Sequence, residues 1–93
     1  MKSLSVQQVI LKWISNNLKL VNSFLFSSVE VQHDIVEYGK RIGVWHTPDL
    51  YSRQWRKIRE EIRSGRDYGF TVEEIEKKGK VVKWYKVMGN ITK

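Results

Sequence analysis

The chain has 93 residues, 41% of them hydrophobic, with four tryptophans and no cysteine. This size fits one small domain that can bury a core, and the lack of cysteine excludes disulfides and thiolate metal sites. The net charge is +7: residues 47–93 hold twelve Lys/Arg against seven Asp/Glu, whereas residues 1–46 hold five against three. Basic charge gathered in one half favours a polyanionic partner, with nucleic acid first among them. A basic domain without such a partner is the alternative.

The first predicted element is a helix that begins after Ser3 or Ser5 and runs to about Leu18 or Val21. Apolar residues recur at helical spacing and form one face: Val6, Val9, Ile10, Trp13 and Ile14. Leu18, Leu20 and Val21 extend past this face and offer a surface for a homodimer. The next apolar run, residues 24–26, is too short for a helix and favours a short strand.

A second helix is predicted after residues 27–30, Ser-Ser-Val-Glu, because this order fits a capping box. Its apolar residues follow at steps of four, three and four: Val31, Ile35, Tyr38 and Ile42. Gly39 weakens this helix by about 1 kcal/mol relative to alanine, and Gly43 is a natural C-cap.

Residues 47–63, TPDLYSRQWRKIREEIR, predict a third helix in which Thr47 is the N-cap, Pro48 the first position and Asp49 a favourable charge at the positive end. One face is apolar and carries Tyr51, Trp55, Ile58 and Ile62. The opposite face is mostly cationic and carries Asp49, Arg53, Arg56, Lys57 and Glu60. Burial of the apolar face, worth roughly 1.5–3 kcal/mol per side chain, is expected to leave the cations in solvent.

A β-hairpin is predicted at the end of the chain, with strands over residues 70–76 and 81–88. A turn at Lys78-Gly79 sets Phe70 opposite Val87, Val72 opposite Tyr85, Glu74 opposite Lys83 and Glu76 opposite Val81. This register puts apolar pairs at the base of the hairpin and the charged pair nearer its tip. We therefore expect the base to be anchored in the core.

The order helix, short strand, helix, turn, helix, hairpin resembles the winged helix-turn-helix family of DNA-binding domains. The resemblance runs from about Val6 to Val87 and includes the basic and apolar run at residues 56–59, the Tyr-Gly-Phe turn at 68–70 and the final strand at 84–87. It implies an α+β fold in a single domain over residues 1–93, with frayed ends at 1–5 and 89–93. It also implies that the third helix enters the major groove of double-stranded DNA and that the hairpin wing touches the backbone.

Carried onto this chain, the resemblance assigns DNA contacts to Thr47, Ser52, Arg53, Arg56, Lys57, Arg63, Lys77, Lys78 and Lys80. Arginine can bond guanine N7 and O6 with both arms of its guanidinium. Lys57 and Arg63 are better placed for phosphates, as are the three lysines at the wing tip. The protein would be a small regulator or the recognition domain of a larger assembly.

Glu73, Glu74 and Glu76 lie just behind the wing tip and would repel phosphates there. In the predicted register Glu73 lies opposite Trp84 and has no charge partner. This feature keeps open a second interpretation, in which the same fold uses its basic face to bind an acidic protein.

Catalytic, metal and cofactor sites are not expected. His33 and His46 lie on different elements, and Asp34 and Glu37 fit a solvated helix surface. Trp45 could stack on a base, although packing in the core or turn is the favoured interpretation. No apolar run approaches the roughly 20 residues of a membrane span, and the N-terminus lacks the features of a secretion signal. We expect a cytoplasmic protein with no membrane partner.

Overall fold

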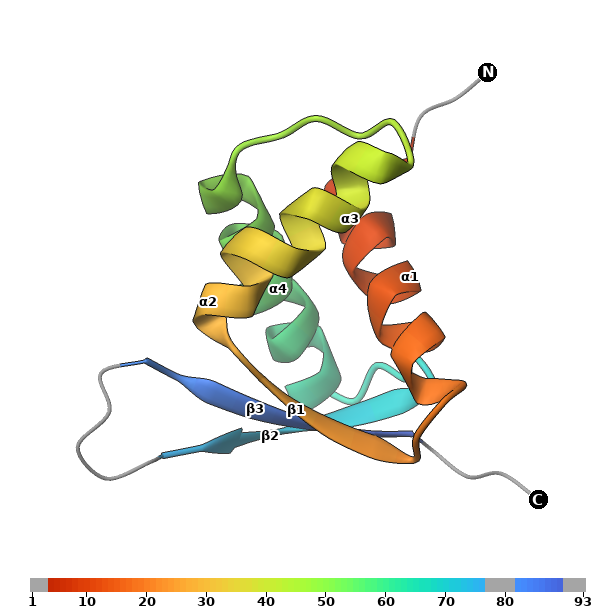
Figure 1. Ribbon diagram of the computed structural model, residues 1–93. Helices are drawn as coiled ribbons and strands as arrows, with labels where there is room; N and C mark the ends of the chain where they lie inside the picture. The colour runs from red at the N-terminus through yellow and green to blue at the C-terminus, as the bar shows by residue number, and fades with distance from the viewer. Residues whose placement is uncertain (1–3, 77–81, 90–93) are drawn as a thin grey trace.

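The computed structural model describes residues 4–76 and 82–89 and shows a small α+β domain. Its helices stand on one face of a three-stranded antiparallel sheet (Figure 1). The strands are β1 (Ser23–Ser27), β2 (Phe70–Ile75) and β3 (Trp84–Gly89), in the spatial order β1-β3-β2. The predicted short strand is therefore β1, an edge strand of the sheet, and it pairs with β3, the second strand of the hairpin.

The first helix, α1 (Val6–Leu18), begins at Ser5, whose hydroxyl accepts the backbone N–H of Gln8 at 3.1 Å. The Gln8 side chain in turn accepts the Ser5 N–H at 2.8 Å, which completes a capping box. Residues 4 and 5 belong to the segment that was expected to fray; in the structure Ser5 is held by the cap and Leu4 packs on the core. Gly89, also predicted to fray, is the last residue of β3.

The second helical stretch is continuous from residue 28 to residue 41, but its middle turn is wide. α2 (Ser28–Glu30) begins at Ser27, whose N–H donates to the Glu30 carboxylate at 3.3 Å, so the predicted capping box is present. A turn of π-helix, η1 (Val31–Ile35), leads into α3 (Val36–Arg41).

The π turn changes which residues face the core after Ile35. Because its hydrogen bonds join residues five apart instead of four, it moves the buried face by about one residue along the chain. Val36 and Gly39 are therefore buried, whereas Tyr38 is half-buried and Ile42 is exposed. The predicted apolar stripe is right up to Ile35 and wrong at Ile42.

The last helix, α4 (Pro48–Arg63), matches the predicted third helix and packs its apolar face on α1, η1 and β2. The centre of the core is an aromatic group that joins two helices and two strands. Four ring centroids lie 5.3–5.7 Å from that of Phe26: those of Trp13, Phe24, Trp55 and Tyr85. Edge-to-face and offset contacts of this kind add to the free energy gained by burial.

The register of the hairpin differs from the prediction by two residues. Phe70 lies opposite Gly89, Val72 opposite Val87 and Glu74 opposite Tyr85. A shift of two preserves the face on which each side chain lies, because the strand period is two. The core side of the hairpin was therefore predicted correctly, while the partners predicted for Phe70, Val72 and Glu74 were wrong. The fourth predicted pair, Glu76 with Val81, lies partly outside the described residues. The predicted turn at Lys78-Gly79 lies outside the described residues.

Candidate nucleic-acid interface

α4 presents three cationic side chains, Arg53, Arg56 and Lys57, on the side that points away from the core. All three are exposed, and none has a hydrogen bond or ion pair with residues 4–76 or 82–89. They are referred to below as the α4 basic strip. The burial of Tyr51 and Trp55 on the opposite side of the helix fixes this orientation.

Two predicted contacts at the start of α4 already have partners within the fold. The Thr47 hydroxyl accepts the backbone N–H of Leu50 at 3.3 Å and caps the helix. The hydroxyl of Ser52, which is half-buried, accepts a hydrogen bond from the Gln32 amide at 2.9 Å. Thr47 therefore shapes the helix, and Ser52 ties α4 to the wide turn of the second helical stretch.

An open depression of about 420 Å³ runs beside the basic strip. Its lining residues all come from α4: Leu50, Arg53, Gln54, Arg56, Lys57 and Glu60. It combines three cations with the single carboxylate of Glu60. Because ligand pockets for small molecules bury most of the ligand, a surface this open suits contact with an extended partner better.

The fourth predicted cation of α4, Arg63, is engaged by a carboxylate of the neighbouring strand. Its guanidinium donates to Glu74 Oε2 at 2.9 Å, and Arg59 lies 3.4 Å from Glu74 Oε1. Arg59 is only 14% exposed and stacks 4.7 Å from the ring centroid of Tyr85. Glu74 therefore holds two arginines of α4 against the hairpin.

This arrangement corrects the predicted charge pattern of the hairpin. Glu74 lies opposite Tyr85 and is neutralised by α4, not by Lys83 across the strands. Glu73, predicted to lie opposite Trp84, lies opposite Lys86. The carboxylates that seemed to oppose a phosphate backbone thus have cationic neighbours at two of three positions.

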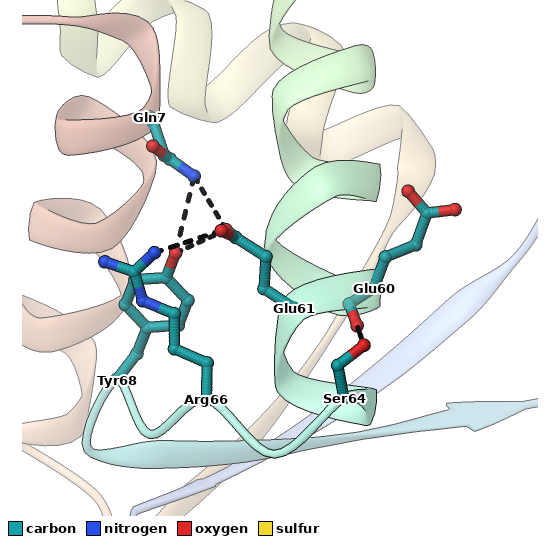
Figure 2. Close-up of polar contacts among 6 residues, drawn as sticks. All are labelled: Gln7, Glu60, Glu61, Ser64, Arg66 and Tyr68. Atoms are coloured by element: carbon teal, nitrogen blue, oxygen red, sulfur yellow. Dashed lines mark hydrogen bonds and ion pairs between the residues drawn. The ribbon is translucent and has the colours of Figure 1, made fainter.

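A second polar group fastens the far end of α4 to α1 and to the loop that follows. Figure 2 shows Glu61 receiving hydrogen bonds from the Tyr68 hydroxyl (2.5 Å), the Arg66 guanidinium (3.0 Å) and the Gln7 amide (3.2 Å). The bond from Tyr68, aided by the charge of Arg66, holds the pKa of Glu61 below its usual value. Partial burial and the hydrogen bond to Glu61 raise the pKa of Tyr68. Arg66, like Arg63, is thus committed within the fold.

The remaining groups considered from the sequence are the wing-tip lysines and the candidate metal ligands. Lys77, Lys78 and Lys80 lie outside the described residues. His33 is exposed and pairs with the neighbouring carboxylate of Asp34 at 2.8 Å. No group of three metal-ligating side chains occurs within residues 4–76 and 82–89.

Trp45, like Ile42, is a residue that the sequence interpretation placed wrongly. Packing in the core or turn was favoured for it, but its side chain is 70% exposed in the loop between α3 and α4. Lys40 lies 5.7 Å from its ring centroid. The neighbouring residue Val44 is buried instead, and successive side chains of an extended segment point to opposite sides.

The sequence matches no protein-family model, and no curated protein or solved structure matches it either. None of the helices in the described part of the chain is both long enough and apolar enough to cross a membrane.

Proposed function

We propose that this chain is a winged helix-turn-helix domain that binds double-stranded DNA through α4, as a small regulator or as the recognition domain of a larger protein. The element order and the pairing of β1 with the hairpin support the fold assignment. The overall charge of +7 favours the approach of a polyanion.

One observation carries the proposal: the cations of α4 and its following turn divide into two sets. Arg59, Arg63 and Arg66 are ion-paired with glutamates of the fold. The α4 basic strip is exposed and has no such partner in the described parts of the chain. A helix presenting unpaired arginines is suited to the major groove, where base edges and phosphates accept their hydrogen bonds.

The proposal is tested by fluorescence anisotropy with random-sequence duplex DNA over a salt series. If about six phosphates are neutralised, the logarithm of the binding constant should fall with the logarithm of salt with a slope near −5. Binding that is absent, or insensitive to salt, would contradict the proposal and favour the acidic protein partner.

A matched pair of double variants separates the strip from general charge. Arg53→Ala with Arg56→Ala should lower affinity at least tenfold, whereas Lys12→Ala with Lys19→Ala removes the same charge from exposed positions of α1 and its C-cap. The second variant should have a much smaller effect. Equal losses in both would show that net charge, and not α4, governs binding.

A further inference from the structure

We infer that β1 is a self-association site, at which a second copy of this chain adds its own β1 to form a continuous six-stranded sheet. The inference concerns the edge of the sheet opposite β2, and it does not depend on DNA binding.

β1 lies at an edge of the sheet, and of its three residues that face away from β3, Ser27 already donates its N–H to Glu30. Among the described strands it pairs with β3 alone. The Ser28 N–H donates to Lys83 and the Gly89 N–H donates to Asn22, so even-numbered residues of β1 direct their backbone groups toward β3. By the alternation of an antiparallel ladder, Ser23 and Leu25 direct theirs outward.

The residue order of β1 reads the same in both directions: Ser23-Phe24-Leu25-Phe26-Ser27. Two antiparallel copies centred on Leu25 would place Ser23 opposite Ser27 of the second copy and Phe24 opposite its Phe26. The two Leu25 residues would exchange two backbone hydrogen bonds across the two-fold axis. A two-fold contact sets the same surface of each copy against the other, so the side chains that meet across the axis must be compatible.

Exposed apolar side chains lie in β1 and on both flanks of it, and the most exposed of them is Leu20, at 85%. Leu25 itself is 46% exposed, and Val21 and Val29, four residues to either side, are 47% and 56% exposed. Val21 precedes β1 and Val29 lies in α2, so both flank the strand at which the two copies would pair. Burial of these side chains adds a hydrophobic contribution to the strand pairing.

Charge also selects this edge as the place where two copies can meet. Each copy carries a net charge of +7, so approach through most faces is opposed by repulsion. Residues 20–29 carry no charged side chain. Natural edge strands are usually protected by lysine, proline or a bulge, and β1 has none of these.

Sedimentation equilibrium of the full chain over a wide concentration range tests the inference. The wild type should approach twice the monomer mass of 11.1 kDa as concentration rises. Leu25→Lys should stay monomeric with an unchanged far-UV circular dichroism spectrum, because it sets two positive charges face to face. Thr71→Lys, the same kind of change at an exposed site on the opposite edge strand, should still dimerise.

A thiol version keeps the test decisive if Leu25→Lys fails to fold. The chain has no cysteine, so Leu25→Cys and Thr71→Cys each carry one thiol. Directly opposed residues of a hydrogen-bonded antiparallel pair have Cα atoms about 5.5 Å apart, within the range that a disulfide spans. Leu25→Cys should form a disulfide-linked dimer on mild oxidation, at least tenfold faster than Thr71→Cys.

Three results would overturn the inference. The wild type could remain at 11.1 kDa at every concentration, even if β1 accepts a strand from another protein. The two lysine variants could dimerise equally well. The two cysteine variants could cross-link at the same rate.

Discussion

The hydroxyl of Tyr51 in α4 occupies the space beside Gly39 in α3 that a larger side chain would need. A Cβ built on Gly39 would lie 2.1 Å from the Tyr51 hydroxyl oxygen and 3.2 Å from the ring carbon that bears it. Tyr51 is fully buried and its ring cannot swing aside, so glycine is what allows α3 and α4 to pack this closely.

Gly39→Ala should therefore destabilise the protein although alanine is the better helix former. The gain in helix propensity is about 1 kcal/mol, whereas forced overpacking costs about 1–3 kcal/mol, and here the overlap is severe. We expect a net loss of about 1–2 kcal/mol in the free energy of unfolding, measured by urea denaturation.

Tyr51→Phe supplies the matched control, because it removes the oxygen and leaves the ring. The Tyr51 hydroxyl has no hydrogen-bond partner among the described residues, so this variant alone should change stability by less than about 1 kcal/mol. Combined with Gly39→Ala, it should recover most of the loss. A double variant as unstable as the sum of the single ones would show that the contact is not the cause.

The role of Gly39 could not be predicted from the sequence, where it reads as a defect in a helix. Periodicity gave the existence of the second helical stretch and its face up to Ile35. The π turn places Gly39 in the interface between α3 and α4, and no local sequence pattern predicts such a turn. Close approach between two helices depends on the partner surface, here Tyr51, which lies on a separate element.

Glu74→Gln should release Arg63 for a phosphate. It removes the carboxylate that accepts hydrogen bonds from α4 and leaves Arg59 with a weaker partner. We expect about 1 kcal/mol of destabilisation, the upper end for a partly exposed ion pair. If α4 binds DNA as proposed, affinity should rise, and the salt slope should become steeper by about 0.9.

Glu76→Gln is the control for this effect. It makes the same change in net charge at an exposed position that has no ion pair with the described residues. It should leave stability and the salt slope nearly unchanged. Equal slopes in the two variants would mean that Arg63 does not reach the DNA.

Sequence reasoning found the exposed face of α4 but could not separate its free arginines from its paired ones. The 3.6-residue period distinguishes solvent from core, and it placed Arg53, Arg56 and Lys57 correctly in solvent. Whether an arginine such as Arg63 has a partner depends on Glu74, which comes from a strand eleven residues away. That distance in sequence carries no periodic signal.

The group around Glu61 should make stability depend on pH in acid. Because the folded pKa of Glu61 is lowered from an unfolded value of about 4.3, its stabilising contribution is fully present above that pH. The contribution is lost as the pH falls through the folded pKa. Glu61→Gln should therefore lower the melting temperature at neutral pH, and its difference from wild type should shrink in acid.

Glu60→Gln, on the adjacent position of α4, provides the comparison. Its side chain is exposed and makes no ion pair with residues 4–76 or 82–89. The two variants should differ at neutral pH and converge toward wild type in acid. A difference for Glu61→Gln that stays constant down to pH 2 would show that its carboxylate charge is not responsible.

The hairpin register was mispredicted because it depended on where the turn was placed. Alternation fixes which residues face the core but not which residues lie opposite one another, so a shift of two residues leaves the apolar pattern intact. The pairing of β1 with β3 supplies the missing constraint on the register: Phe24 of β1 lies opposite Val87, and Val87 in turn lies opposite Val72 of β2. That contact joins segments far apart in sequence.

A charge-reversal cycle at Glu73 and Lys86 tests the register directly. The two residues lie opposite each other in the structure, whereas the predicted register would put Lys86 opposite Thr71. Glu73→Lys and Lys86→Glu should each destabilise the protein by about 0.2–1 kcal/mol, because like charges then face each other. The double variant restores opposite charges and should recover most of the loss in urea denaturation. Strictly additive effects in the double variant would show that the two side chains do not interact, and would favour the register in which Lys86 faces Thr71.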